Sequence, residues 1–247
     1  MKILVLLAPV LDTEAKIKLN ESKTAINTTG IQQVINPWDE FALTRALELK
    51  EQNQAFVESV TIATVGTSAV EPVMRKALAI GADVAYRIDY EPTDAFVCAS
   101  QLTTIAQQFD LIITGVENSD YNGSTVGPML AAMLNIESLG GVSRLDINQN
   151  TIIADCDMNG VIKTIEAPTP LLVVVQKGIA AQVRIANMRG IMTAKNKPLN
   201  VIAPIDCQPQ TTLSNLNYPP HKNKCTMVDA DNAAELIRLL REEARVL

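Results

Sequence analysis

Acid–base and metal-binding side chains are scarce in this sequence of 247 residues. The single histidine, His221, lies in the stretch YPPHKNK, where a solvated loop residue is expected. Serine or cysteine catalysis assisted by histidine would depend on it, and no neighbouring residue supports that role. The four cysteines, Cys98, Cys156, Cys207 and Cys225, form no CxxC pair, so no zinc or dithiol redox site is predicted. Any chemistry on electrons or phosphates would therefore depend on a bound cofactor.

Long apolar runs and clustered positive charge are also missing. No run reaches the roughly 18 apolar residues of a membrane-spanning helix, so we expect no integral membrane segment. The net charge of −6 argues against a nucleic-acid surface, which needs clustered lysine and arginine. The start, MKILVLLAPVLD, lacks a signal-peptide cleavage site and is interpreted as a buried strand. Widely spaced thiols are typical of a reduced protein, so a cytoplasmic location is expected.

Strands and helices are predicted to alternate through the first half of the chain. Apolar runs predict strands in residues 2–10, 57–66, 84–90 and 110–116, and amphipathic runs predict helices in residues 37–53, 68–82, 94–109 and 126–136. Pro37 suits the first turn of a helix, Gly81 a C-terminal cap, and Thr93 or Asp94 an N-terminal cap. Four such repeats predict a parallel sheet with helical crossovers that cover both of its faces.

The pattern changes after residue 142. Residues 143–177 are predicted to form antiparallel strands, with turn signals at 148–150 and 159–160 and a buried strand in LLVVV. Residues 178–225 have few periodic runs, and a structureless stretch of that length favours a segment that wraps a partner. A last helix in residues 230–247 has Leu236, Leu239, Leu240 and Val246 on one side. It would pack on this domain or on another subunit.

The segment TGVENSDYNGSTVGPMLAAML, residues 114–134, has the composition of an anion-binding loop. It follows a predicted strand, and ligands of parallel sheets bind at the carboxyl ends of the strands. Gly115, Gly123 and Gly127 allow unusual backbone dihedral angles, and a helix beginning near Val126 would direct its positive end at the loop. Neither a P-loop nor a GxGxxG motif is present. Composition alone favours equally a polar loop that only caps its helix.

Several segments resemble the beta subunit of electron transfer flavoproteins, a family that includes the FixA-like proteins. The resemblance runs from end to end and rests on the order and spacing of KILVLLAPVLDTEAKIKL, VINPWDEFALTRALELKE, VMRKALAIGADVAYRID, DLIITGVENSDYNGSTVGPMLAAML, TIEAPTPLLVVVQKG, NMRGIMTAKNKPL and PPHKNKCTMVDADNAAELIRLLREEARVL. It implies a three-layer α/β fold with a parallel sheet, of the adenine nucleotide alpha hydrolase-like type. It also implies an antiparallel addition and an extended C-terminal arm. Residues 1–200 would form the nucleotide-binding domain, and residues 201–247 an arm and helix that pack on the partner subunit.

The resemblance further implies a role in electron transfer. Such a subunit pairs with a larger alpha subunit, accepts electrons from flavin dehydrogenases and passes them on. It binds an adenine nucleotide, which is structural AMP in the housekeeping type and a second FAD in electron-bifurcating and FixA-like types. The positions that match the nucleotide site are Leu6, Asn36, Asp39, Val65, Asn118, Asp120, Gly123, Ser124, Thr125, Val126, Gly127 and Met129.

This sequence departs from the family pattern in ways that bear on the choice of nucleotide. The loop ending Val126-Gly127-Pro128 and the segment 189–192, RGIM, look like the FAD-binding type. Thr125 replaces a usual glutamine, and Ala8-Pro9 replaces a usual Lys-Arg pair. Cys156 stands where a basic residue is normal, and a thiol does not stabilise a reduced, anionic flavin as a cation would. FAD is therefore expected, with AMP as the alternative.

The resemblance also predicts a surface on which a partner protein docks. The resemblance makes Met188 an apolar anchor for a dehydrogenase, beside Arg189 and Ile191. Without the resemblance, Met188 and Ile191 are interpreted as core residues.

A competing hypothesis is a stand-alone adenine-nucleotide sensor without an electron-transfer role. It explains the loop but not residues 178–247. A hydrolase or ligase of the adenine nucleotide class would need a nucleophile, base or metal set that the sequence does not offer.

Overall fold

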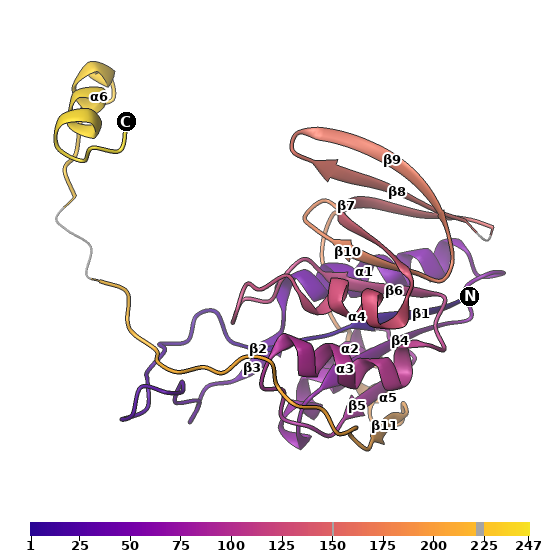
Figure 1. The fold of residues 1–247 in the computed structure, drawn as a ribbon. Coiled ribbons are helices and arrows are strands. Elements are labelled where there is room, and N and C mark those ends of the chain that lie inside the picture. Colours follow the sequence, from indigo (N-terminus) through magenta and orange to yellow (C-terminus); the bar gives the residue numbers. More distant parts are fainter. Residues whose placement is uncertain (150, 221–224) are drawn as a thin grey trace.

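A computed structural model describes residues 1–149, 151–220 and 225–247. Two residues named above lie outside this part of the chain: His221, the single histidine, and Asn150, which ends the predicted turn at 148–150. Within this part of the chain, the core is a nine-stranded sheet with the order β11-β5-β4-β1-β6-β10-β7-β8-β9 (Figure 1). The neighbouring strands from β11 to β7 run parallel, whereas β7, β8 and β9 are antiparallel to one another. The strands are β1 (Lys2–Leu6), β4 (Ser59–Val65), β5 (Val84–Ile88), β6 (Leu111–Gly115), β7 (Glu137–Asn148), β8 (Thr151–Met158), β9 (Val161–Pro168), β10 (Leu171–Val175) and β11 (Leu199–Ile202).

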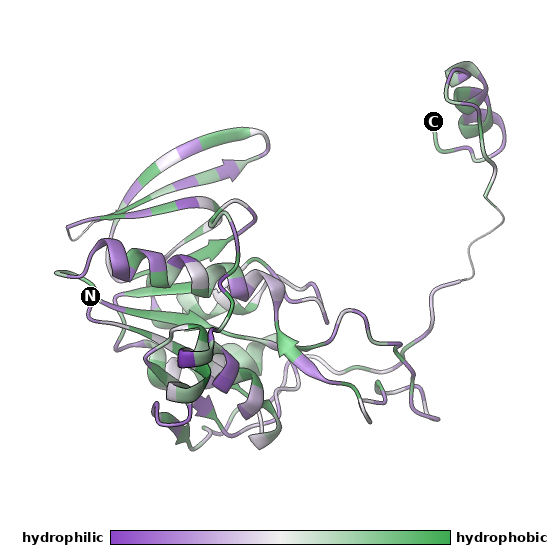
Figure 2. Cartoon of the chain, turned by 180° about the vertical axis from the view of Figure 1, so that it is seen from behind, coloured by the Kyte–Doolittle hydropathy of each residue, from purple (hydrophilic) through white to green (hydrophobic). Residues whose placement is uncertain are grey.

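Helices cover both faces of the parallel part of the sheet. The helices are α1 (Pro37–Gln52), α2 (Glu71–Ile80) and α5 (Met188–Ala194) on one face, and α3 (Ala95–Ala106) and α4 (Val126–Leu134) on the other. Alternate residues of β1 enter different cores: Ile3 and Val5 pack under α1, while Leu4 and Leu6 pack under α3 and α4. This double burial explains why the strand sequences are apolar without alternation. In Figure 2 the central strands are correspondingly hydrophobic, and the predicted three-layer α/β fold is confirmed.

Local sequence signals place most helix ends. Pro37 occupies the first turn of α1, and the Asp94 side chain caps α3 by accepting a 2.8 Å hydrogen bond from the Val97 amide. Gly81 ends α2 with φ of 153°, a conformation that suits glycine. These three signals are confirmed.

The predicted first strand is divided in two. β1 ends at Leu6, and β2 (Pro9–Leu11) leaves the main sheet to pair with β3 (Gln33–Ile35) in a separate two-stranded sheet. The break occurs where the Ala8 amide donates to the Asp39 side chain instead of to a neighbouring strand.

The second half of the chain contains elements that the sequence interpretation missed. β10, the LLVVV strand, is parallel to both β6 and β7 and so belongs to the main sheet, while β7, β8 and β9 form the predicted antiparallel addition. The short helix α5 and the edge strand β11 lie in residues 178–225, for which no element was predicted. β11 crosses residue 200, so the main sheet extends past the expected start of the arm.

An extended arm follows β11. It leads to α6 (Ala233–Glu242), which lies away from the body of the protein in Figure 1. The arm therefore has the predicted extended form, and no residue of α6 is buried. In the described part of the chain, no helix has the length and hydrophobicity to cross a membrane.

Candidate functional site

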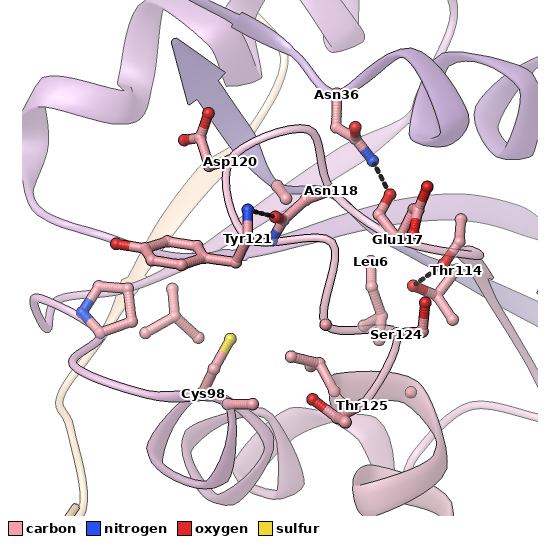
Figure 3. Close-up of a pocket in the computed structure, with 18 of the residues that line it drawn as sticks. Leu6, Asn36, Cys98, Thr114, Glu117, Asn118, Asp120, Tyr121, Ser124 and Thr125 are labelled. Atoms are coloured by element: carbon pink, nitrogen blue, oxygen red, sulfur yellow. Dashed lines mark hydrogen bonds between the residues drawn. The ribbon is translucent and has the colours of Figure 1, made fainter. Parts of the chain in front are cut away.

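A cavity of about 420 Å³ opens at the carboxyl ends of β1, β4 and β6. The strand ends, the loop 116–125 and the first turns of α3 and α4 surround it (Figure 3). Of the predicted nucleotide-site residues, those that line this cavity are Leu6, Asn36, Asp39, Val65, Asn118, Asp120, Gly123, Ser124, Thr125, Val126 and Gly127. Met129 does not line it and instead packs against the apolar cluster under α3 and α4.

The cavity has an apolar floor and a polar rim. Leu6, Ala63, Val65 and Leu102 contribute to the floor, where a flat aromatic ring would displace water from apolar surface. The loop 116–125 supplies amide, hydroxyl and carboxylate groups above it. This arrangement suits a ligand with one aromatic end and one strongly polar end.

Free backbone amides gather where the loop meets α4. Among the described residues, no acceptor is found for the amide hydrogens of residues 123–127, all of which line the cavity. Those of Val126 and Gly127 are in the first turn of α4, where a helix offers no internal acceptor. The helix N-terminus adds a partial positive charge of about 0.5 elementary charge. Such a group of donors suits an anion such as phosphate.

Gly115 and Gly127 allow close packing, and none of the three glycines adopts an unusual dihedral angle, which corrects the expectation from composition. None of Gly115, Gly123 and Gly127 has a positive φ; instead Asn122 and Ser124 adopt φ of 50° and 51°. A Cβ at Gly115 would lie 2.6 Å from the Asp39 side chain, and one at Gly127 would lie 2.7 Å from that of Thr114. Gly123 faces more open space, because its nearest contact would be 3.5 Å away.

Asn36 brings an unpaired acceptor to the cavity. Its side-chain amide donates to the Glu117 carbonyl over 2.8 Å (Figure 3), which orients the side chain. Its Oδ1 is buried and has no hydrogen-bond partner among the described residues. A buried acceptor without a donor is costly, so a ligand that donates a hydrogen bond to this atom would remove that cost.

Asp39 joins the ends of two strands. Its carboxylate oxygens accept hydrogen bonds from the Ala8 amide at 2.8 Å and the Gly115 amide at 3.0 Å. Burial raises the pKa of this carboxyl to about 7, against the lowering effect of these hydrogen bonds and of Asn36. Asp39 therefore joins the ends of β1 and β6 at the edge of the cavity, and its raised pKa makes it only partly ionised near neutral pH.

Asp120 fastens the loop to the small sheet. Its carboxylate accepts from the Leu11 amide of β2, with N–O distances of 3.3 and 3.4 Å. Partial burial raises the pKa of this carboxyl, and the Leu11 hydrogen bond lowers it. Beside it, the Tyr121 amide donates to the Asn118 side chain at 2.8 Å, and the Tyr121 ring is 79% exposed (Figure 3). The loop is thus fixed at its base and presents an aromatic ring at the mouth.

Sequence reasoning missed one wall of the cavity. Asp94 and Cys98 of α3 line it, as do three arm residues, Thr211, Thr212 and Leu213. Burial, and then the nearby Asp94 carboxylate, raise the pKa of the Cys98 thiol to about 12, so this cysteine is a neutral group. Only the capping pattern at Asp94 was visible in the sequence, and it gave no reason to connect α3 with the arm.

Two positions that depart from the family pattern have different surroundings. Ala8 and Pro9 line the cavity, and neither residue contributes a charge to it. Cys156 is 1% exposed in the core beneath the antiparallel strands and does not line the cavity. Burial, and then Asp155, raise the pKa of its thiol.

The predicted docking residues lie together on α5, on the opposite face of the sheet from α3 and α4. Met188 is 74% exposed and Ile191 47% exposed, so their interpretation as core residues is wrong. Met192 and Ile185 extend the same apolar surface, and Arg189 is exposed between them.

Reciprocal hydrogen bonds hold α5 on α2. Arg75 of α2 donates to the carbonyls of Ala194 and Lys197, at 2.9 and 2.7 Å. The Lys197 ammonium donates to the carbonyls of Leu78 and Ala82, at 2.9 and 2.7 Å. Gly190 lets the two helices approach, since a Cβ there would lie 2.2 Å from the Ala79 carbonyl oxygen. The helix α5 is therefore fixed on α2, and its exposed apolar side chains have a defined position.

The described residues contain no cluster of three or more histidine, cysteine, aspartate or glutamate side chains that could hold a metal ion. Their binding groups are the amide donors, the Asn36 acceptor and the apolar floor. These groups suit the binding and orientation of a ligand.

Comparison with known proteins shows the family of the chain. Residues 23–206 match the family model described as the electron transfer flavoprotein domain. The chain is 33% identical to the electron transfer flavoprotein subunit beta of Bacillus subtilis, and the match covers all of both proteins. It is 30% identical to the mitochondrial electron transfer flavoprotein subunit beta of rice, again over both full lengths. It is 28% identical to the electron transfer flavoprotein subunit beta of Methylophilus methylotrophus, over 98% of each protein. The chain therefore belongs to the electron transfer flavoprotein family, as a relative of its beta subunits.

Proposed function

We propose that this chain carries out its electron-transfer role as one half of a heterodimer with an alpha subunit. The pair accepts electrons from flavin dehydrogenases and passes them on. The cavity binds an adenine nucleotide, either FAD or AMP. The observation that carries this proposal is the set of free amides at residues 123–127, which line the same cavity as Asn36 with its unpaired oxygen.

The groups of the cavity complement the parts that FAD and AMP share. Free amides and the positive end of α4 bind phosphate oxygens. Asn36 Oδ1 accepts from a hydroxyl or amino group of the nucleoside, which removes the cost of its unpaired state. The apolar floor takes the adenine ring. When FAD is the ligand it supplies the redox chemistry, whereas AMP is structural.

Two further surfaces fit partner proteins. The exposed apolar side chains of α5, with Met188 at their head, dock the flavin dehydrogenase, and Arg189 contributes positive charge at the rim. The arm and α6 pack on the alpha subunit, because an amphipathic helix with no buried residue gains stability only by covering its apolar side. We expect this assembly in the cytoplasm, where the four free thiols stay reduced.

Purification tests the proposal directly. The tagged chain, expressed in its native host, should elute with a larger, yellow partner. Mass spectrometry of the released ligands should find an adenine nucleotide in addition to the partner's flavin. A colourless, stable monomer that binds AMP or ATP would instead support the nucleotide sensor.

A further inference from the structure

Part of the C-terminal arm, residues 205–218, lies along the body of the protein before the chain leaves it; we call this segment the strap. Figure 1 shows it in orange, running from the region of β11 past β2 and β3. Three of its residues, Thr211, Thr212 and Leu213, line the nucleotide cavity. The strap is therefore a wall of that cavity, although the nucleotide loop is far from it in sequence.

The strap is fastened at three points. At its start, the Gln101 side chain of α3 makes a pair of hydrogen bonds with the Ile205 backbone, at 2.7 and 2.9 Å. At its end, Leu216 donates to the Lys23 carbonyl at 2.8 Å, and the Tyr218 hydroxyl accepts from the Leu19 amide at 2.9 Å. The middle fastening is the one beside the cavity.

Asp94 makes that middle fastening. Its Oδ1 caps α3 by accepting from Val97. Its Oδ2 accepts from the amides of Gln210 and Thr211 at 2.6 and 2.8 Å, and from the Thr211 hydroxyl at 3.2 Å. The Val97 hydrogen bond and then those of the strap hold the pKa of this carboxyl below its usual value. One ionised carboxylate thus binds both the start of α3 and the wall of the cavity.

The position of the strap limits what the cavity can hold. Its volume of about 420 Å³ lies toward the small end of the range of small-molecule sites, roughly 300–1,000 Å³. AMP is a single nucleotide, whereas FAD carries a second phosphate, a ribityl chain and a three-ring flavin. The apolar floor and the amides of residues 123–127 can receive the part that both share. The remainder of FAD has to find space against a wall of the cavity. Besides the loop 116–125, which carries the phosphate donors, and the short connections around residues 7–9, 36 and 92–94, the strap is the part of the lining that lies outside the main sheet and its helices.

We propose that the strap, held by Asp94, is the element that makes this cavity select a mononucleotide over FAD. FAD binds only when residues 211–213 move away, at the cost of the hydrogen bonds to Asp94. This inference depends on the proposed nucleotide site and adds the choice between its two ligands. It also assigns to Asp94 a positioning role, in which the residue acts through its hydrogen bonds to the strap.

The substitution Asp94→Ser separates the two tasks of this residue. Serine caps helices about as well as aspartate, so α3 keeps its start, but serine has no second oxygen for the strap. Tyr218→Phe is the matched control, since it removes one strap hydrogen bond far from residues 211–213. The full-length chain, freed of ligand, is titrated with AMP and with FAD, and amide hydrogen exchange is measured for residues 205–213.

We expect the unsubstituted chain to bind AMP at least about tenfold more tightly than FAD, an effect the size of one net hydrogen bond. Asp94→Ser should speed exchange in residues 205–213 and reduce this preference about tenfold, while Tyr218→Phe leaves it unchanged. If exchange is faster in Asp94→Ser but the ratio of its AMP and FAD affinities equals that of the wild type, the role of the strap is overturned while the nucleotide site stands. Unchanged exchange in Asp94→Ser would overturn the role of Asp94. A wild-type chain that binds neither compound would overturn the nucleotide site and the strap proposal with it.

Discussion

Two side chains near the start of α1, Asn36 and Asp39, show how single residues prepare this cavity for a ligand. Asp39 uses both oxygens on backbone amides of the protein, while Asn36 keeps one oxygen free. Asp39 thus holds the backbone at the ends of β1 and β6, and Asn36 keeps an acceptor available for the proposed ligand. Their spacing of three residues places them on one side of the first helical turn.

Gly123 offers the cleanest test of the phosphate site. Gly127 is less suitable, because any side chain there collides with Thr114. Gly123→Asp places a carboxylate among the free amides, and repulsion should weaken nucleotide binding by at least about tenfold, or about 1.4 kcal/mol. Gly123→Asn, of nearly the same size but uncharged, is the control and should bind more tightly than the aspartate variant. Equal binding by the two variants, measured by titration, would place the phosphates elsewhere.

The raised pKa of Asp39 predicts a pH dependence of stability. Its carboxyl has a pKa of about 7 in the folded protein, against 3.8 for an unperturbed aspartate. The folded state thus holds the proton more tightly, so the stabilisation from this group is complete below about pH 4 and is lost as the pH rises to about 7.

Asp39→Asn removes this titration. The difference in unfolding free energy between wild type and variant, from urea melts at several pH values, should therefore change across this range. The variant should also be less stable by roughly 1–3 kcal/mol, because an amide nitrogen then faces a backbone donor. Glu21→Gln, at an exposed loop position, is the control. A constant difference from pH 4 to pH 7 would contradict the assignment to Asp39.

Among the elements, α5 shows most clearly what a short helix can do when another helix holds it. Seven residues are too few for a stable isolated helix, so its order depends on Arg75, Lys197 and the close contact at Gly190. These contacts leave its apolar side chains exposed, which is unusual for methionine and isoleucine unless a partner covers them.

Met188→Lys should slow electron transfer from a flavin dehydrogenase to the alpha–beta complex about tenfold, because burying an unpaired ammonium in an interface is costly. Nucleotide content should not change, since α5 is remote from the cavity lining. Met133→Lys is the control: Met133 is 37% exposed on α4, on the other face of the sheet. Stopped-flow rates equal to those of the wild type would contradict a docking role for Met188.

The elements that the sequence predicted are those with strong periodic or capping signals. The alternation of buried strands and amphipathic helices, with Pro37, Gly81 and Asp94 at helix ends, predicted the parallel sheet up to α4. The elements α5 and β11 have too few residues for a visible period, and their stability comes from contacts with α2 and β5. The division of residues 2–10 between two sheets depends on Asp39, which is distant in sequence.

At the scale of the whole molecule, the chain closes its cavity with segments from its beginning, middle and end. The loop was predicted from composition and resemblance because it is one continuous stretch. The wall from the strap was not, because Asp94 and Gln210 are 116 residues apart and have no pattern in common. The sequence also could not show whether the loop glycines are needed for close packing or for unusual dihedral angles, because the answer depends on which atoms lie next to them in the fold.

A ligand that contacts so many segments should stabilise the entire fold. Removing the nucleotide by partial unfolding and dialysis should lower the unfolding free energy by about 2.7 kcal/mol, relative to protein with ligand at 100 times its Kd. Calorimetry should show a lower Tm that AMP or FAD restores in a concentration-dependent manner, with inosine as a control that lacks phosphate. No change in Tm with either nucleotide would contradict a ligand that links these segments.

The contact between Gly190 and the Ala79 carbonyl has a consequence for electron flow. Rates of electron tunnelling fall steeply with the separation of donor and acceptor. If a dehydrogenase docks on α5, the spacing between α5 and α2 contributes to the distance that its electron must cross. A single added methyl group at residue 190 would act as a spacer, and the tunnelling gap would then depend on a side chain that touches neither redox partner.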